Sequence, residues 1–221
     1  AASLIVQRLV GTDGGSGLCS VLGTSIKCGP SFAALANGTA AHALDFDDMC
    51  WISLAHPSAP LVSSTLAVGE MADVSGRDFL DAYVVGFEIE AVLGRTMNPL
   101  HYTRGWHGTA TIGTLGAAAA ASRVLGLDTE TTGRALAIAS SEASGLKENF
   151  GTMVKPLQGG LAARNGVLAA LLAREGFSAS VHAIDGTQGL LIAMQSSGTD
   201  LKDGCEQLGK RWEIVEGGIT M

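Results

Sequence analysis

The stretch from Thr109 to Leu125 constrains the fold more than any other part of the chain. Gly113 and Gly116 stand three residues apart in it, five alanines follow directly, and Arg123 is its only charged residue. A helix with one apolar stripe can cover a core from outside, but a helix that is apolar all round has to be buried. The sequence therefore predicts a central helix whose small side chains let other helices approach closely on both sides.

Most of the remaining chain follows the helical period of 3.6 residues. Gly76 to Met97 is the clearest amphipathic case, and we expect its Glu88 and Glu90 to face water or a partner subunit. An acidic cap is predicted at Asp128, and Gly176 has the position of a glycine that ends a helix. The predicted helices cover residues 31–48, 59–74, 76–97, 109–125, 128–144 and 159–175.

Strand signals are weak, because only Trp212 to Val215 alternates cleanly between apolar and polar residues. The Gly- and Ser-containing stretches at 11–17 and 195–200 are predicted to be loops within one domain. We therefore predict a mainly α-helical fold, with residues 1–221 forming a single helical domain.

Composition limits the partners that this chain can have. Hydrophobic residues make up 47% of it and charged residues 16%, which favours buried helices and a subunit interface, as in a homodimer. A net charge of −7 with scattered Lys and Arg excludes a nucleic-acid partner. Four cysteines without metal-type spacing predict free thiols in a cytoplasmic protein. The most apolar segment, 109–121, is too short to cross a membrane, so no membrane partner is expected.

Acidic and imidazole side chains concentrate in one short region. Ionised groups are costly to bury, so such a cluster in an apolar chain requires either solvent or a functional role. If the helix continued through this region, His42 would lie on the same face as Asp45 and could orient it. The alternative is a solvated helix end with capping acids. The cluster comprises His42, Asp45, Asp47, Asp48 and His56.

Three apolar residues favour a site over a solvated helix end. Trp51, Ile52 and Leu54 follow the acidic run and could form a hydrophobic wall around the loop that leads to His56. Cys50 has no adjacent base and is interpreted as a packing residue.

A second candidate lies where a loop leads into the glycine–alanine helix. Free amides and the positive dipole at a helix start favour an anion, and Arg104, His107 and Thr109 could assist there. A carboxylate would suit this position. The alternative is a threonine-capped helix start with a hydrogen-bonded histidine.

Lys155 is the third candidate, because it stands in an apolar, glycine-rich stretch. Pro156 biases it toward an extended backbone, from which its ammonium group could reach inward as a point charge. The alternative is a surface lysine that lays its stem on apolar neighbours.

Familiar catalytic motifs are missing from the sequence. It contains no phosphate-binding glycine loop, no G-x-S-x-G elbow and no H-E-x-x-H pair, which removes the commonest nucleotide, serine-hydrolase and zinc-protease interpretations. A metal-dependent hydrolase stays a remote alternative that sensitivity to a chelator would support.

Several blocks in one order resemble the MmgE/PrpD family, which includes 2-methylcitrate dehydratase, cis-aconitate decarboxylase and iminodisuccinate epimerase. The resemblance covers almost the whole chain and is carried by Asn37 to Asp48, His56-Pro57-Ser58, Gly105 to Thr109, Gly113 to Ala120, and Lys155-Pro156-Leu157. It implies an all-helical domain and a smaller α+β lid that is largely absent from this chain. We expect the chain to be a fragment, with the lid following residue 221.

The resemblance also implies the site residues. By position they are Asp45, His56 and His107 as catalytic groups and Lys155 as a substrate-binding group. Arg104 and Thr109 are added as substrate-binding candidates from their place at the helix start. Met49 stands where the cis-aconitate decarboxylases carry Thr, and the loop is one residue longer, which counts against a decarboxylase.

The reaction that the resemblance implies is proton transfer at a carbon next to a carboxylate, with no cofactor and no metal. Our first hypothesis is a lyase of the 2-methylcitrate dehydratase type that acts on a di- or tricarboxylate. The alternatives are an epimerase of an amino-dicarboxylate, a cis-aconitate decarboxylase-like enzyme, and a non-catalytic helical scaffold that only dimerises.

Overall fold

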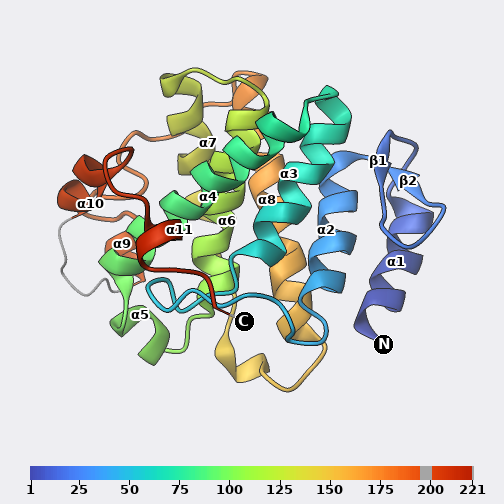
Figure 1. Ribbon diagram of the computed structural model, residues 1–221, viewed down its shortest axis with the longest axis horizontal. Coiled ribbons are helices and arrows are strands. Elements are labelled where there is room, and N and C mark those ends of the chain that lie inside the picture. The colour runs from blue at the N-terminus through green and yellow to red at the C-terminus, as the bar shows by residue number, and fades with distance from the viewer. Residues whose placement is uncertain (195–200, 221) are drawn as a thin grey trace.

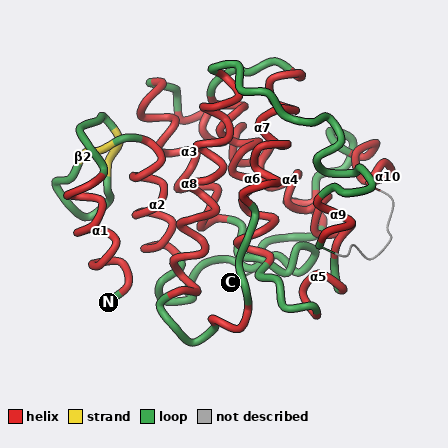
Figure 2. Tube along the Cα trace, turned by 180° about the vertical axis from the view of Figure 1, so that it is seen from behind, coloured by secondary structure: helices red, strands yellow, loops and turns green. Residues whose placement is uncertain are grey.

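The computed structural model describes residues 1–194 and 201–220, and within them helices predominate (Figure 2). The long helices are α1 (Ala2–Asp13), α2 (Pro30–Ala41), α3 (Ser58–Ala72), α4 (Gly76–Met97), α6 (Gly108–Val124), α7 (Thr129–Glu142) and α8 (Val154–Arg174). The shorter ones are α5 (Leu100–Thr103), η1 (Lys147–Asn149), α9 (Leu190–Ala193), α10 (Leu201–Gln207) and α11 (Glu213–Glu216). The fold is mainly α, as predicted.

The predicted central helix is confirmed. Nearly every residue of α6 is buried, and α6 packs against α3, α4, α7 and α8. Helix α8 in turn contacts α2, α3 and α7 (Figure 1). Within the described residues, no helix combines the length and hydropathy that a membrane crossing requires.

Glycines set the distance between α2 and α8. A Cβ on Gly38 would lie 2.9 Å from the Cα of Gly160, and a Cβ on Gly160 would lie 2.2 Å from Thr39 Oγ1. Real Cβ atoms do not come so close, so only glycine permits this approach. The contact places the end of α2 directly beside the first turns of α8.

Four observed helices lie within two residues of their expected bounds, namely α3, α4, α6 and α7, and the predicted end of α8 is also close. Gly76–Met97 is confirmed as α4, whose cap Ser75 accepts a hydrogen bond from the Asp78 amide. Asp128 caps α7 by accepting from the Thr131 amide, as predicted. Gly176 follows α8 with a φ of 88°, the left-handed conformation expected of a residue that ends a helix.

The predicted helix at 31–48 is wrong at its end, because α2 stops at Ala41 and His42 is its C-cap. Asp45 has a φ of 59°, a left-handed conformation that no α-helix contains. The acidic residues therefore lie on a loop, and the predicted helical face shared by His42 and Asp45 does not exist.

The start of α8 also differs from the prediction. The helix begins at Val154 instead of Gly159, so Lys155 is helical and not extended. Pro156 is tolerated because it falls in the first turn, where amide groups have no partner within the helix.

Four smaller expectations need correction. Residues 213–216 form α11 and not a strand, and residues 11–13 belong to α1. Glu88 and Glu90 are buried instead of facing water. Trp51 is 64% exposed and forms no wall of the site. The predicted loop at 195–200 lies outside the described residues.

Several elements carried no sequence prediction, among them helix α1 and a two-stranded hairpin. Helix α1 packs on α2, and β1 (Cys19–Ser20) pairs antiparallel with β2 (Lys27–Cys28). Both lie at one side of the bundle (Figure 1).

Candidate active site

One end of the helical body contains a pocket of about 300 Å³. The loop that follows α2 and the loop that precedes α8 meet there with the start of α6, at the lower end in Figure 1. The lining residues are Asp45, Met49, Leu54, His56, Tyr102, His107, Phe150, Gly151 and Lys155. The structure therefore brings together Asp45, His56, His107 and Lys155, which are widely separated in the sequence.

Asp45 and Lys155 form an ion pair in this pocket. The hydrogen bond from Lys155 holds the pKa of Asp45 below its usual value. The Lys155 side chain is only 15% exposed, and its Nζ lies 5.5 Å from the centre of the Phe150 ring. Of the two alternatives that the sequence left open, the structure therefore shows Lys155 reaching inward and not lying on the surface.

His107 is held by a chain of hydrogen bonds. Gln158 donates its amide group to the Leu146 carbonyl at 3.2 Å, which turns the Gln158 oxygen toward His107 Nδ1 at 2.6 Å. Because that oxygen can only accept, Nδ1 carries the proton and Nε2 keeps a free lone pair. Nε2 is buried without a partner. Burial lowers the pKa of His107 to about 3, so the ring is neutral at pH 7.

His56 enters the pocket from the turn before α3. Its backbone amide donates to Thr109 Oγ1 at 3.0 Å, and its Nε2 lies 3.7 Å from Asp45 Oδ1. Burial lowers the pKa of His56, while the nearby Asp47 opposes that shift. Thr109, predicted to bind substrate, is buried and holds His56 instead of lining the pocket.

Arg104 is exposed at the end of α5. It is not among the residues that line the pocket. The predicted substrate-binding role of Arg104 therefore gains no support from its position and stays a prediction.

The sequence reasoning did not commit to two polar side chains that border this site. His42 Nδ1 lies 2.7 Å from Asp47 Oδ2, and both side chains are almost fully buried. His42 also stacks on His107 at 5.6 Å between ring centres. Both residues were included in the acidic cluster of the sequence. The helix assumed there, however, paired His42 with Asp45 instead of Asp47.

Two residues of the α8 region were missed as well. Gln158 follows Lys155 by three residues and lies on the same helical face. This relation was missed because an extended backbone was predicted for Lys155. Phe150 meets the edge of His107 at 4.9 Å between ring centres and gave no polar signal in the sequence.

His42, Asp45, Asp47 and His56 each offer one ligand atom, and these atoms lie within 4.8 Å of one another. A metal ion could bind to these four atoms. However, Asp45 already contacts the ammonium group of Lys155, and Asp47 already contacts His42. A cation would have to displace the ammonium group of Lys155. The prediction that no metal takes part therefore stays a prediction.

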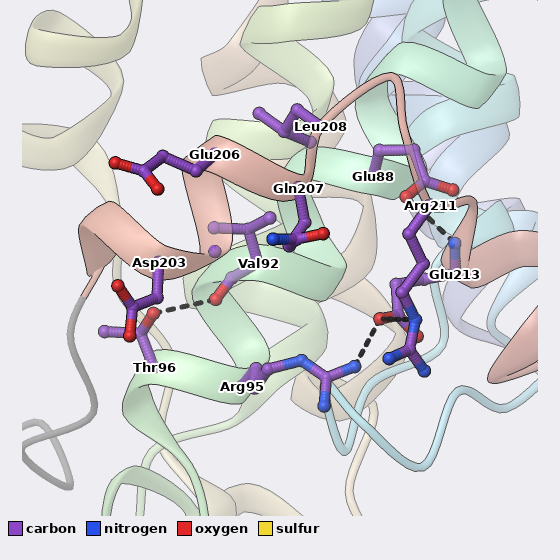
Figure 3. Close-up of a pocket in the computed structure, with 11 residues that line it drawn as sticks. Glu88, Val92, Arg95, Thr96, Asp203, Glu206, Gln207, Leu208, Arg211 and Glu213 are labelled. Carbon is purple, nitrogen blue, oxygen red and sulfur yellow. Dashed lines mark hydrogen bonds and ion pairs between the residues drawn. The ribbon is translucent and has the colours of Figure 1, made fainter.

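A second pocket of about 320 Å³ lies between α4, α10 and α11 (Figure 3). Arg95 and Arg211 both form ion pairs with Glu213. Glu88 accepts hydrogen bonds from the amides of Glu213 and Ile214 at 3.0 and 3.1 Å, which anchors the start of α11. Both arginines of this pocket are thus paired with one carboxylate, whose Oε2 is buried without a hydrogen-bond partner among the described residues.

The sequence profile of the MmgE/PrpD N-terminal domain matches residues 1–202. The chain belongs to the MmgE/PrpD family. That match ends at the start of α10, so the ion-pair pocket is built partly from residues beyond the MmgE/PrpD N-terminal domain, whereas every residue of the histidine-lined pocket lies inside it.

Three relatives in this family carry related names. The chain is 35% identical to the cis-aconitate decarboxylase-like protein oryM of Aspergillus oryzae, over 90% of the chain and 44% of the relative. It is 37% identical to human cis-aconitate decarboxylase, over 72% and 34%, and 33% identical to that of Aspergillus terreus, over 91% and 42%. The family is of lyase type, and the chain spans less than half the length of these relatives.

Proposed function

We propose that the protein carrying this chain is a lyase that acts on a small di- or tricarboxylate without metal or cofactor. The reaction transfers a proton at a carbon next to a carboxylate. The observation that carries the proposal is that two imidazoles, His56 and His107, and one ammonium group, Lys155, face a single pocket of about 300 Å³.

Three positive features of the pocket favour a polycarboxylate. Lys155 supplies a full charge, and the first turns of α6 and α8 each supply the positive end of a helix dipole. His107 stands at the cap of α6 and Lys155 in the first turn of α8, so both dipoles act at the same place. Substrate binding would take over the contact that Lys155 now makes with Asp45.

The two imidazoles are suited to different tasks. His107 stays neutral because burial lowers its pKa to about 3, and its free Nε2 can accept a hydrogen bond from the substrate. His56 lies beside the carboxylates of Asp45 and Asp47, which favour its protonated form. Burial still lowers the pKa of His56, but because these carboxylates oppose that shift we assign the delivery of the proton to His56.

Decarboxylation of a cis-aconitate-type tricarboxylate is the reaction that the names of the relatives support. The bond to the departing carboxylate breaks, and its electron pair shifts through the neighbouring double bond. The proton from His56 then adds to the former alkene carbon, so one proton is consumed and one CO₂ is released. Lys155 and the helix starts stabilise the negative charge that develops.

Dehydration of a hydroxy-tricarboxylate of the 2-methylcitrate type is the second candidate. Met49 favours it, because this residue lines the pocket where the resemblance places Thr in the decarboxylases. In that reaction one imidazole removes the proton and the other protonates the departing hydroxyl group. An epimerase would return the proton on the opposite face of the same carbon.

The test is to incubate the full-length protein with cis-aconitate, with 2-methylcitrate and with an amino-dicarboxylate in deuterated water, and to follow products by NMR. Decarboxylation predicts CO₂ together with one deuterium in the product. Dehydration predicts new C=C absorbance without CO₂. Exchange with inversion and no C=C absorbance would indicate the epimerase.

Two results would contradict the proposal itself. One is that none of these polycarboxylates is bound or turned over, and the other is that a chelator abolishes the activity. The non-catalytic scaffold would be supported if His107→Ala and Lys155→Ala both left any measured activity and polycarboxylate binding unchanged.

A further inference from the structure

Asp47 lies between two imidazoles and does not itself line the histidine-lined pocket. Its Oδ2 is 2.7 Å from His42 Nδ1, and its Oδ1 is 3.6 Å from His56 Nδ1. The Asp47 side chain is 8% exposed. One buried carboxylate thus faces the inner nitrogens of both rings.

One oxygen of Asp47 and one ring nitrogen of His56 are suited to form a hydrogen bond with each other. Asp47 Oδ1 and His56 Nδ1 are both buried and have no hydrogen-bond partner within the described residues. The two atoms lie 3.6 Å apart and complement each other, because an ionised carboxylate only accepts and a protonated ring nitrogen donates. Hydrogen bonds in a substrate-free site are often long and shorten when substrate binds.

We propose that Asp47, held in place by His42, is the positioning residue that keeps the proton of His56 on Nδ1 and presents Nε2 to the substrate. This inference rests on the proposed lyase function, in which His56 Nε2 transfers the proton to carbon. The proton on Nδ1 stays where it is throughout, and the one that leaves Nε2 is replaced from solvent.

His42 is well placed to fix the carboxylate. It is the C-cap of α2, its side chain is fully buried, and it packs on α8, where a Cβ on Gly159 would lie 3.3 Å from its ring. Its ring also lies 4.8 Å from that of His56. The close contact of α2 and α8 thereby sets the position of Asp47.

The charged and titratable groups around His56 act on it from several sides. Asp45 and Asp47 face it from its own loop, His42 from the end of α2, His107 from the start of α6 and Lys155 from α8. Burial, His42 and Lys155 oppose its protonated form, whereas the two carboxylates favour it. Of the two carboxylates, Asp45 is engaged by Lys155, which leaves Asp47 to orient the ring.

Asp47→Asn in the full-length protein is the first test. The amide can still accept from His42, but it then turns its NH₂ group toward His56 Nδ1, which forces the ring proton onto Nε2. We expect kcat to fall roughly 10²- to 10⁴-fold with an almost unchanged KM, because Asp47 does not line the pocket. Asp73→Asn, an exposed residue with a similar left-handed backbone, is the matched control and should keep wild-type kcat.

A pair of His42 variants separates positioning from packing. The amide nitrogen of His42→Asn can occupy the place of Nδ1 and donate to Asp47, so this variant should retain most of the activity. His42→Ala removes the donor and should lower kcat in the same way as Asp47→Asn. Equal losses in both variants would show that His42 serves packing alone and would overturn its part in the proposal.

The ring proton can be located without any activity. Correlation spectra of the ¹⁵N-labelled protein distinguish Nδ1–H from Nε2–H histidines, with His56 assigned through its loss in His56→Gln. We expect Nδ1–H in the wild type and Nε2–H in Asp47→Asn. This measurement does not depend on the lyase assay. A failure of the proposed lyase function can therefore be distinguished from a failure of the inference about Asp47.

Three outcomes would overturn the inference. The first is an Nε2–H tautomer of His56 in the wild type, and the second is an unchanged kcat in Asp47→Asn. The third is stoichiometric binding of added Zn²⁺ that requires Asp47 and is needed for turnover, because the four side chains would then be metal ligands.

Discussion

The two pockets are nearly equal in size, at about 300 and 320 Å³, yet their polar groups differ in kind. In the pocket between α4, α10 and α11, Arg95 and Arg211 both form ion pairs with Glu213 (Figure 3). In the histidine-lined pocket, the buried nitrogens His107 Nε2 and His56 Nδ1 have no hydrogen-bond partner among the described residues.

This difference supports the proposal that the histidine-lined pocket is the one that does chemistry. Buried polar groups are normally hydrogen-bonded, so an unsatisfied one requires an explanation. A substrate would supply that explanation for His107 Nε2, whereas the unpartnered atom of the ion-pair pocket, Glu213 Oε2, belongs to a carboxylate whose other oxygen already pairs with both arginines. Each of the following predictions tests whether the division between a chemical and a structural pocket holds.

The largest effect is expected at His56. His56→Gln removes the proton donor, and we expect kcat of the full-length protein to fall roughly 10²- to 10⁴-fold without loss of folded protein. His182→Gln, at an exposed position, is the matched control. A loss of similar size in the control, or none in His56→Gln, would break the comparison.

Lys155→Met should weaken substrate binding more than the proton transfer. It removes a charge-assisted contact, which corresponds to about 1.5–3 kcal/mol, so we expect KM to rise roughly 10- to 100-fold. Steady-state kinetics check this, with the exposed Lys210→Met as control. An unchanged KM would assign carboxylate binding to the helix starts alone.

His107 predicts a dependence of stability on pH. The folded protein protonates His107 only near its lowered pKa of about 3, whereas the unfolded chain does so near 6.5. Between these values the unfolded state binds more protons, so stability falls as pH decreases through the window. His107→Gln should show a shallower decrease of the thermal midpoint between pH 6.5 and 4 than the wild type. Equal slopes would contradict the lowered pKa.

The smallest effect on catalysis is expected from the ion-pair pocket. Glu88→Gln weakens the contacts that anchor α11, and we expect a loss of about 1–2 kcal/mol in stability with unchanged kcat and KM. Thermal unfolding and kinetics of the same preparation test this. A large decrease in kcat would show that the structural pocket is coupled to the chemistry.

Periodicity predicted most of the helical body, because its helices carry long stretches of consistent pattern. Gly76–Met97 was placed at its observed bounds, and the burial of α6 followed from its lack of charged residues. Helix ends were harder to place. Asp45 adopts a left-handed backbone conformation, which ends the predicted helix early. Pro156 lies inside the first turn of α8, so this helix begins earlier than predicted. Local sequence alone decides neither of these two helix boundaries.

The four main site residues were found through the order of short blocks along the chain. The residues that contact these side chains were not predicted, because such contacts depend on where the helices end and the loops turn. His42 pairs with Asp47 only because α2 stops at Ala41, and Gln158 reaches His107 only because α8 begins before Lys155. The burial of Glu88 likewise depends on α11, which lies 125 residues further along.

Glu90 is sealed in the core, where both its carboxyl oxygens lack a hydrogen-bond partner among the described residues, and burial raises its pKa well above the usual value. A Cβ on Gly116 would lie 2.4 Å from Glu90 Cγ. The two positions are therefore coupled, and their substitutions should not be additive. Among diverging sequences, alanine at 116 becomes admissible only after a shorter residue has replaced the glutamate, so the order in which the two positions change is restricted.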